Sequence, residues 1–575
     1  MPKVTIDGKE FEAQQGQTVI QVALENGIDI PHFCWHPALS VAGNCRMCLV
    51  DVEKIPKLSI ACSTTVGEGM VVHTQNEKSI KGREDVMEFL LINHPLDCPI
   101  CDEAGQCKLQ DYAFSHSRGV SRFEEEKVHK EKRVPFGPTV LFDAERCISC
   151  SRCIRFGEEI ADQPVLTFVD RGDHVTIEPF PGMQLDNPYS MNVIDICPVG
   201  ALTSRDFRFK ARPWDMSFTE TVCPHCARGC NIRAGVRDNE IMRLEPRPNP
   251  NVNDFWMCDV GRLESYPPVN AADRISGAFL KLAGSSESSP IDSAAALVAK
   301  SLAKYKPEEI AFVASAFATI EDNFSFLQLA KTKSKHIGYF PFTQGENDKL
   351  LIRADRTPNS YGLKLLGIKE FGSEFTDLLK SGKIKAIYSL EDDFLTRANL
   401  AFDKVEFFAC HATNQSATTG RADVILPAAS WAEKEGVFIN FEGWAQKLRP
   451  SVETTHLQRG RDYMNQSRLD RFGSKFDRWA QGRKIDAYES WQLVEMVGTH
   501  FGIKTDHLYT EDVFEKAATV IPALKGLDYG KIGTFGHPVF GVDKAIKTSY
   551  YREVYQIDTQ TPTHLSLHEI EIGTV

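Results

Sequence analysis

The chain has 575 residues, enough for about three to five domains of ordinary size. Its 42% hydrophobic and 25% charged residues are typical of globular proteins and disfavour a disordered, collagen-like or coiled-coil chain. The net charge of −12, from 66 Lys+Arg against 78 Asp+Glu, argues against general nucleic-acid binding, because neutralising phosphates needs a basic face.

The sequence also limits where the protein resides. No apolar run approaches the roughly 18–20 residues of a membrane-spanning helix, so we expect the chain not to cross a bilayer. Residues 1–10 show neither a secretory nor a transit pattern, which favours the cytoplasm. Of the 16 cysteines, all but Cys410 lie between Cys34 and Cys258, and their C-x2-C spacings favour metal thiolates over disulfides.

The chain begins with the pattern of a small strand-and-helix domain. Val4 and Ile6 alternate with polar residues before the turn Asp7-Gly8, and apolar residues between 19 and 24 form a helical face that ends at Gly27. This is similar to the start of a plant-type ferredoxin, although the first cysteine gap is longer here. We expect a [2Fe-2S] cluster on the first group, Cys34, Cys45, Cys48 and Cys62.

A second group follows a predicted helix whose apolar positions lie between 86 and 92 and which Pro95 ends. Its members are His94, Cys98, Cys101 and Cys107. Three thiolates and one imidazole can hold either a structural zinc ion or a [4Fe-4S] cluster, and the ligand types alone leave both open. His94 is a candidate because it stands shortly before Cys98.

Two further groups complete the set. The third is a C-x2-C-x2-C run with a distant Cys-Pro, typical of one bacterial-type [4Fe-4S] cluster: Cys147, Cys150, Cys153 and Cys197. The fourth, for which four-cysteine zinc remains the alternative, is Cys223, Cys226, Cys230 and Cys258. Fifteen cysteines and His94 thus give sixteen ligands in four sets of four. Four redox centres in one chain indicate a path along which electrons hop.

This order of motifs resembles the 75 kDa-type iron-sulfur subunit of the bacterial respiratory NADH-quinone oxidoreductase, complex I, from the start of the chain to about residue 270. The group of one histidine and three cysteines is its most specific part, since only some iron-only hydrogenases and NAD-linked formate dehydrogenases share it. The resemblance implies one [2Fe-2S] cluster on the first set and [4Fe-4S] clusters on the other three. It further implies an electron relay toward quinone with no catalytic residue of its own.

The resemblance also implies partners and a location. NADH and FMN would bind to a neighbouring flavoprotein subunit, with its [2Fe-2S] partner subunit and a ferredoxin-like subunit carrying two [4Fe-4S] clusters nearby. The chain would lie in the peripheral arm, on the cytoplasmic side of the bacterial inner membrane, and meet the membrane only through the complex, where other subunits translocate protons. It contains neither a dinucleotide-binding G-x-G-x-x-G after a strand nor a P-loop, so no nucleotide site is expected here.

The expected fold is multidomain, both α+β and α/β. It comprises a β-grasp [2Fe-2S] ferredoxin domain (1–80), a one-His-three-Cys [4Fe-4S] domain (81–120), a ferredoxin-like [4Fe-4S] domain (121–215), a four-Cys [4Fe-4S] domain (216–272) and a shortened molybdopterin-oxidoreductase-like α/β domain without cofactor (273–575). In the last domain, a helix over 293–305 and strands over 310–315, 384–390 and 405–410 predict a parallel sheet. The serine-rich residues 285–290 are interpreted as a loop at the start of the helix, with a short linker as the alternative.

The back half resembles the molybdopterin oxidoreductases around residues 422–436 but departs from them. Those enzymes usually continue as Asn-x-Glu-Gly-Arg, whereas this chain has Trp444 after Gly443, and no cysteine follows Cys258 where a molybdenum ligand would be expected. Cys410 lies in a predicted strand and is interpreted as a buried thiol. We therefore expect this domain to bind no pterin and to serve as a scaffold.

Two C-terminal segments are candidates for contact with a partner. The stretch from Lys447 to Lys484 carries ten Lys/Arg, including Arg459, Arg461, Arg468, Arg471 and Arg478, and is interpreted as a solvated face or as a contact with an acidic partner subunit. Residues 550–575 show no helical period and are interpreted as an extended arm docking on a neighbour.

Three other functions compete with the relay. The alpha subunit of an NAD-linked formate dehydrogenase would need a molybdenum ligand, unless its molybdenum site has been lost or altered. An iron-only hydrogenase would need further cysteines after Cys258, which Cys410 alone cannot supply. A zinc-stabilised scaffold is disfavoured by the C-x2-C-x2-C run with its Cys-Pro.

Overall fold

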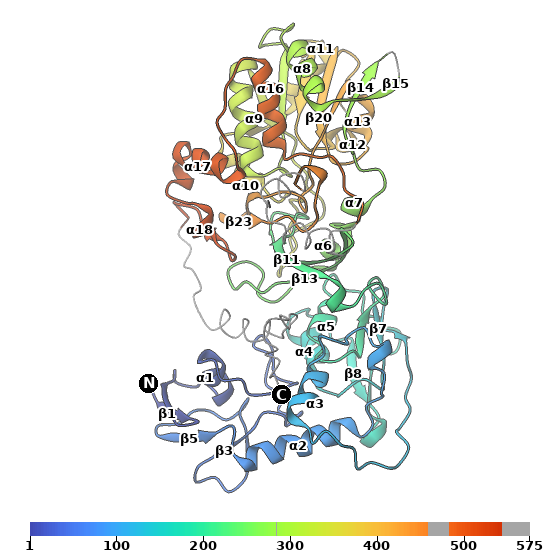
Figure 1. Cartoon of the computed structure of the whole chain (residues 1–575), viewed down its shortest axis with the longest axis vertical. Coiled ribbons are helices and arrows are strands. Elements are labelled where there is room, and N and C mark those ends of the chain that lie inside the picture. Colours follow the sequence, from blue (N-terminus) through green and yellow to red (C-terminus); the bar gives the residue numbers. More distant parts are fainter. Residues whose placement is uncertain (283–284, 399, 458–481, 543–575) are drawn as a thin grey trace, which may run out of the picture. The chain divides into compact units, whose positions relative to one another are not determined.

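The computed structural model describes residues 1–282, 285–398, 400–457 and 482–542 (Figure 1). They divide into two compact units, Met1–Met216 and a second that begins at Ser217, and each is described by itself. Within the described residues, no helix combines the length and apolar character needed to span a bilayer. Most of the basic stretch, with the five arginines named above, and all of residues 550–575 lie outside the described residues.

The first unit opens with a five-stranded sheet in the order β2-β1-β5-β3-β4. Strand β1 pairs in parallel with β5 and antiparallel with β2, and Val4 and Ile6 share a buried core with the helix α1. This mixed sheet with one helix is the predicted β-grasp domain. Its elements are β1 (Lys3–Ile6), β2 (Lys9–Glu12), α1 (Val19–Glu25), β3 (Leu49–Val52), β4 (Ser59–Ile60) and β5 (Met70–His73).

The ends of α1 follow from local sequence. Thr18 caps its start, where the Gln21 side chain accepts a hydrogen bond of 2.9 Å from the Thr18 amide. After the C-cap Asn26 the chain turns at Gly27, whose φ of 73° is left-handed and favours glycine. The predicted helix end at Gly27 is confirmed.

The rest of the first unit consists of short helices and small sheets that carry the second and third cysteine groups. The predicted helix before His94 is α2, which ends at Leu91, ahead of Pro95. The elements are α2 (Glu77–Leu91), η1 (Cys98–Ile100), α3 (Lys108–His116), β6 (Val134–Pro135), β7 (Val140–Phe142), α4 (Arg152–Glu159), β8 (Leu166–Val169), η2 (Gly172–His174), β9 (Thr176–Pro179), α5 (Asn192–Asp195), β10 (Leu202–Ser204) and η3 (Pro213–Asp215).

The second unit begins with an antiparallel sheet in the order β11-β12-β13, which frames the fourth cysteine group. Cys223, Cys226 and Cys230 lie in the connection between the first two strands, and Cys258 precedes α6. The elements are β11 (Ser217–Val222), β12 (Asn231–Arg237), β13 (Glu240–Pro246), α6 (Asp259–Glu264) and α7 (Pro267–Asn270).

The core of the second unit is an eight-stranded sheet in the order β15-β14-β21-β20-β19-β16-β17-β18. The strands from β21 to β18 are parallel, and helices cover the sheet, so the predicted parallel α/β domain is confirmed. The three predicted strands correspond to β16, β19 and β20, and the predicted helix to α8. The elements are α8 (Ile291–Leu302), β16 (Ile310–Ala314), α9 (Ile320–Lys333), β17 (His336–Tyr339), α10 (Ser360–Leu365), β18 (Lys369–Glu370), α11 (Ser373–Ser381), β19 (Ala386–Ser389), α12 (Phe394–Arg397), β20 (Phe407–Ala412), α13 (Ala417–Arg421) and β21 (Val424–Pro427).

One local prediction in this region was wrong. Residues 285–290 were expected to form a loop, but Ser285–Ser289 is strand β15, paired antiparallel with β14 (Ala278–Leu282) at the edge of the sheet. An edge strand needs backbone pairing on one side only and tolerates exposed polar side chains, so a serine-rich sequence can adopt it. Pro290 then stands at the N-cap position of α8 and makes no side-chain capping hydrogen bond.

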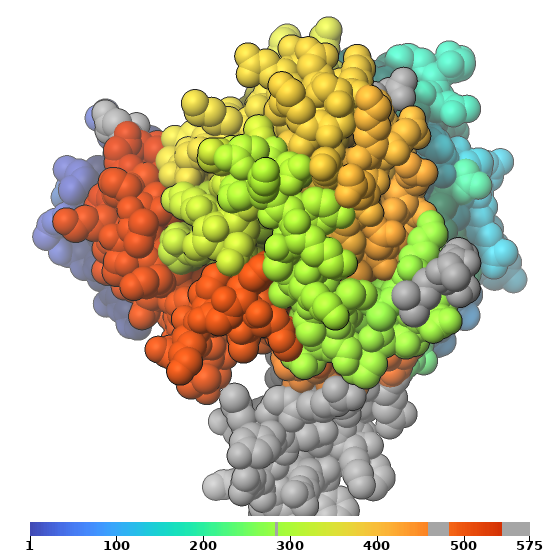
Figure 2. Space-filling model, turned by 90° about the horizontal axis from the view of Figure 1, so that it is seen from above, coloured from blue at the N-terminus to red at the C-terminus, as the bar shows by residue number. Residues whose placement is uncertain are grey.

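Segments after the sheet complete the second unit. Helix α16 packs on α8 and α9, and α17 packs on α9. Figure 2 shows this red-orange surface beside the yellow-green surface of the earlier helices. Cys410 in β20 is fully buried, as predicted. The remaining elements are β22 (Gly436–Ile439), β23 (Trp444–Leu448), α16 (Ser490–His500), α17 (Thr510–Val520), η5 (Pro522–Leu524), α18 (Tyr529–Ile532) and β24 (His537–Pro538).

Candidate metal centres

The first cysteine group lies on three loops of the β-grasp domain that meet at one place. Cys34 follows α1, Cys45 and Cys48 precede β3, and Cys62 follows β4. The Cys34 amide donates a hydrogen bond of 3.4 Å to the Cys45 sulfur. A hydrogen bond from the Cys45 thiol lowers the pKa of Cys34 to about 5 and raises the pKa of Cys45. The Cys48 and Cys62 thiols form a second such pair.

The second group surrounds the turn η1 and the start of α3. Cys98 is exposed, whereas Cys101 and Cys107 are buried, and Cys101 interacts electrostatically with both other thiols. Burial, and then the charge of Arg146, lower the pKa of His94 to about 4. The same arginine acts on Cys101. His94 is therefore neutral at pH 7, which is the form of imidazole that binds metals.

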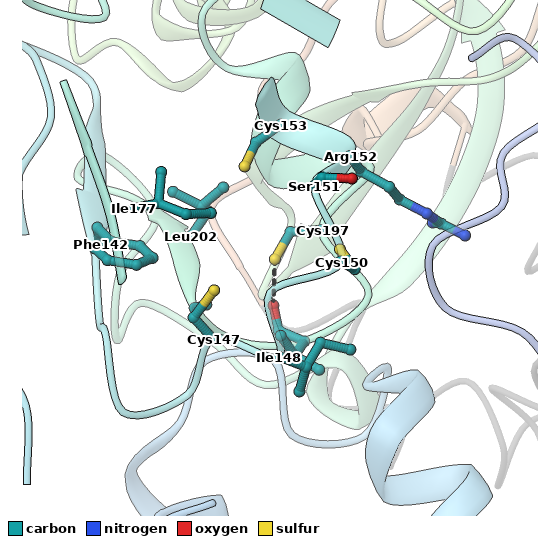
Figure 3. A pocket seen from close by; sticks show the side chains of 12 residues that line it. Phe142, Cys147, Ile148, Cys150, Ser151, Arg152, Cys153, Ile177, Cys197 and Leu202 are labelled. Carbon is teal, nitrogen blue, oxygen red and sulfur yellow. Dashed lines mark hydrogen bonds between the residues drawn. The ribbon is translucent and has the colours of Figure 1, made fainter. Parts of the chain in front are cut away.

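The third group lines one cavity of the first unit. Figure 3 shows the sulfurs of Cys147, Cys150, Cys153 and Cys197 gathered around this space, whose wall is completed by the apolar side chains of Phe142, Ile177 and Leu202. Four sulfur ligands around an apolar cavity fit the requirements of a cubane cluster better than those of a polar ligand.

The backbone of the C-x2-C-x2-C loop aims amides at these sulfurs. Ser149 and Ser151, between the cysteines, have φ values of 51° and 61°, so the chain turns left-handed twice before α4 begins. The Ser149 amide donates a hydrogen bond of 3.4 Å to the Cys147 sulfur. Such N–H groups stabilise a negatively charged sulfur.

The fourth group is buried in the second unit. The thiols of Cys223, Cys226, Cys230 and Cys258 interact electrostatically with one another. Cys258 is the N-cap of α6, and its sulfur accepts a hydrogen bond of 3.3 Å from the Gly261 amide. The helix N-terminus thus faces a thiol, an arrangement that favours the thiolate.

Burial sets the charge state of most of these thiols. It raises the pKa of Cys107, Cys147 and Cys258 to about 12, so the isolated thiols would remain protonated at pH 7. A thiolate in such a place requires a compensating cation, which a bound metal supplies.

In the described residues, no three Cys, His, Asp or Glu side chains surround one point closely enough for a single metal ion.

Two glycines allow close approach to cysteine sulfurs. A Cβ atom at Gly200 would lie 2.2 Å from the Cys101 sulfur, and a Cβ at Gly261 would lie 3.2 Å from the sulfurs of both Cys223 and Cys258. Gly200 belongs to the Cys197-Pro198 loop, so the second and third groups are in contact. The Cys107 thiol and the Lys108 amide both reach the Pro198 carbonyl, at 3.9 and 3.2 Å.

A second cavity, of about 740 Å³, lies in the second unit and was not predicted from the sequence. It lies at the carboxyl ends of β19 and β20, the usual ligand position of a parallel sheet. Its lining includes five carboxylates and neither lysine nor arginine: Glu264, Asp273, Glu391, Asp392 and Asp393. Lys434 and Arg397 pair with two of these, Glu391 and Asp392.

Family models match the chain in the same order as the cysteine groups. They are a 2Fe-2S iron-sulfur cluster binding domain (2–77), the NADH-ubiquinone oxidoreductase-G iron-sulfur binding region (83–122), the ferredoxin-like domain of NADH-quinone oxidoreductase subunit 3 (137–203), the molybdopterin oxidoreductase Fe4S4 domain (216–263) and molybdopterin oxidoreductase (335–460). These matches confirm 2Fe-2S and 4Fe-4S binding domains followed by a molybdopterin-oxidoreductase-like domain.

Curated relatives are named as subunits of NADH-quinone or NADH-ubiquinone oxidoreductases. The G-type subunit of the NADH-quinone oxidoreductase of Rickettsia bellii (strain RML369-C) is 42% identical over 345 residues, which are 60% of this chain and 50% of the relative. The mitochondrial NADH-ubiquinone oxidoreductase 78 kDa subunit of Candida albicans is 39% identical, over 57% of this chain and 46% of the relative. A solved NAD+-reducing [NiFe]-hydrogenase is 27% identical over 36% of this chain and 90% of that chain, with a TM-score of 0.33.

The chain spans about half the length of the curated relatives it matches. Within that span, sequence identity and the order of the family models agree with the resemblance drawn from the cysteine spacing. Over that span, the chain is therefore similar to the G-type iron-sulfur subunit of NADH-quinone oxidoreductase.

Proposed function

We propose that the chain is an electron-relay subunit of an NADH-quinone oxidoreductase, carrying single electrons from an NADH- and FMN-binding subunit toward quinone. The observation that carries the proposal is the gathering of four thiols around one apolar cavity, within a domain that matches the ferredoxin-like family model. A series of such centres transfers electrons without a site that binds a substrate. This subunit then has no complete active site of its own.

The proposed ligands are the sixteen residues of the four groups, with one [2Fe-2S] cluster on Cys34, Cys45, Cys48 and Cys62 and [4Fe-4S] clusters on each of the others. Backbone amides directed at Cys45, Cys147 and Cys258 would stabilise the charge of each cluster. When bound, the clusters supply reversible one-electron chemistry, and the protein orients and shields them. The proposed domains are 1–80, 81–120, 121–215, 216–272 and 273–575.

The proposal includes partners and a position within the complex. The neighbours would be the NADH/FMN flavoprotein subunit, its [2Fe-2S] partner and the ferredoxin-like subunit with two [4Fe-4S] clusters. The chain would lie in the peripheral arm on the cytoplasmic side of the membrane. Proton translocation would belong to other subunits.

We further propose that the molybdopterin-like domain is a scaffold without pterin. The cavity at the carboxyl ends of β19 and β20 is acidic, and its lining contains no lysine or arginine. A pterin cofactor carries phosphate, which would face carboxylates here rather than the cations and amides that bind phosphate. The residues that line this cavity therefore do not fit a cofactor that carries phosphate.

Metal and sulfide analysis of the anaerobically purified full chain tests these proposals. We expect about 14 iron atoms per chain, the sum over one [2Fe-2S] and three [4Fe-4S] clusters, with matching sulfide. Molybdenum should be absent. Zinc in place of iron would contradict the cluster assignment, and molybdenum with formate oxidation would favour the formate dehydrogenase alternative.

The Gly200→Ala variant is expected to lose the second cluster. The new methyl group would overlap the Cys101 sulfur at 2.2 Å and also lie 2.9 Å from the Glu103 Cβ, so Cys101 must move out of ligand position. Iron content should fall from about 14 to about 10 per chain, with loss of one EPR signal. Gly67→Ala is the matched control, since its Cβ would meet only the tip of Met70 at 3.9 Å. An unchanged set of EPR signals in Gly200→Ala would contradict the assignment of Cys101.

A further inference from the structure

One buried arginine connects the loops of two cysteine groups in the first unit. Arg155 lies on α4, one turn after Cys150, and is 7% exposed. Its Nη2 donates hydrogen bonds to the Cys34 carbonyl at 2.6 Å and to the Cys150 carbonyl at 3.4 Å. Cys34 belongs to the first group and Cys150 to the third, so a single nitrogen holds backbone from both.

The rest of the guanidinium is also engaged. Nη1 donates to the Ser40 carbonyl, and Nε donates to the Ser151 hydroxyl at 3.2 Å. The Ser40 amide in turn donates to the Glu159 carboxylate at the end of α4, at 2.8 Å. All three nitrogens of Arg155 therefore have partners, and these partners lie on the loops after Cys34 and around Cys150.

Two nearby contacts join the same loops. Arg152, at the start of α4, donates to the Trp35 carbonyl and to the Ile196 carbonyl at 3.1 Å. The Asn44 side chain donates to the Ser149 carbonyl at 3.1 Å. The segments carrying the first and third groups are thus fixed together by several hydrogen bonds, and among these donors Arg155 is the one that reaches a cysteine carbonyl in each group.

The charge of Arg155 acts on both groups. Electrostatic attraction to Cys150 and Cys34 partly offsets the effect of burial, which lowers the pKa of this arginine. A guanidinium retains its charge even when buried and offers donors in a planar fork, whereas a lysine ammonium is a compact charge on a flexible chain. A fixed positive charge beside two thiolate centres stabilises their more negative, reduced states.

We propose that Arg155 is a positioning residue for electron transfer, which fixes the Cys34 loop against the Cys150 loop and shares its positive charge between the two centres held there. The proposal rests on the proposed cluster assignment. An electron that passes from one centre to the other oxidises the donor centre by one electron and reduces the acceptor centre by one electron. No bond is made or broken. Arg155 would set both the separation of the two centres and the potentials between which the electron moves.

The test compares Arg155→Gln and Arg155→Lys in the full chain by EPR during redox titration. Loss of the charge in Arg155→Gln should lower the reduction equilibrium constant of both centres about tenfold, ~59 mV for a one-electron couple. Arg155→Lys should retain both potentials, but one ammonium nitrogen cannot reproduce the contacts that the three guanidinium nitrogens make to the Cys34, Ser40 and Cys150 carbonyls and the Ser151 hydroxyl. The spin–spin interaction between the two reduced centres, measured by pulsed EPR, should therefore weaken in both variants.

The exposed Arg171 of the same unit provides the control, and Arg171→Gln should leave potentials and spin–spin interaction unchanged. Wild-type potentials in Arg155→Gln, or an unchanged spin–spin interaction in Arg155→Lys, would overturn the proposal. If Arg155→Gln fails to retain its clusters, Arg155→Lys decides alone through its spin–spin interaction. A wild-type chain without reducible clusters would refute the proposed function, whereas a loaded wild type with unaffected variants would refute only the role of Arg155.

Discussion

Replacing Cys153 with alanine is expected to remove one complete [4Fe-4S] cluster and abolish electron transfer from NADH to quinone in the assembled complex. Cys153 is buried, lines the cavity of the third group and lies on the first turn of α4. Among the described residues that line this cavity, no fifth cysteine is present to replace the lost thiolate. Iron should fall from about 14 to about 10 per chain.

The control for this variant is Cys410→Ala. Cys410 is also a buried cysteine, but it lies in β20 of the second unit, away from the four groups in sequence. Iron content and EPR signals should remain at wild-type levels in this variant. Loss of iron from Cys410→Ala, or full iron content in Cys153→Ala, would contradict the ligand assignment.

Replacing Lys434 with methionine is expected to destabilise the second unit by about 3–5 kcal/mol. The ammonium of Lys434 is fully buried and lies 2.8 Å from Asp322 and 2.7 Å from Glu391. Methionine would leave both carboxylates in the core without their cation. The cost is that of uncompensated buried charge, which exceeds the value of the ion pair itself.

The loss of stability in Lys434→Met should depend on pH. Burial already raises the pKa of Glu391 to about 7, with Lys434 opposing the shift. Without the ammonium, the folded-state pKa of Glu391 rises further above its unfolded value of about 4, and the pKa of Asp322, which Lys434 helps to hold below its usual value, rises as well. The folded variant then binds protons more tightly, so destabilisation is smallest at low pH and grows as the pH rises above those values.

Chemical unfolding of the full chain at pH 5 and pH 8 measures this effect. Lys335→Met serves as the matched control, because Lys335 also pairs with a glutamate, Glu308, but both side chains are more than half exposed. Surface pairs of this kind contribute about 0–1 kcal/mol, so the control should unfold almost as wild type does. Equal stability of Lys434→Met and Lys335→Met would show that the buried pair contributes little.

The sequence predicted the parallel sheet well, because β16, β19 and β20 are short runs of apolar residues between helical segments. It did not predict β15, because every side chain in this edge strand is serine or glutamate. The alternation of apolar and polar residues that indicates a strand is therefore missing. Strand pairing of that kind depends on the neighbouring strand rather than on the residues themselves.

The candidate ligands could be grouped by spacing alone, since each C-x2-C step keeps its thiols close together. The contacts between groups could not be predicted in this way. Arg155 and Cys34 are separated by 121 positions, and Gly200 meets Cys101 only through the fold. One clue was present in the sequence, because Arg152 and Arg155 lie on either side of the candidate ligand Cys153 on one helix, and arginines are rarely buried unless they have partners.

Mössbauer spectroscopy of the ⁵⁷Fe-enriched full chain, reduced and oxidised, tests the four-cluster relay most directly. The account predicts that all iron resides in clusters, about 2 of 14 atoms in a [2Fe-2S] site and about 12 in [4Fe-4S] sites, and that every site accepts an electron from dithionite. A spectrum lacking the [2Fe-2S] component, or with iron for fewer than three [4Fe-4S] clusters and zinc in the remaining sites, would contradict it.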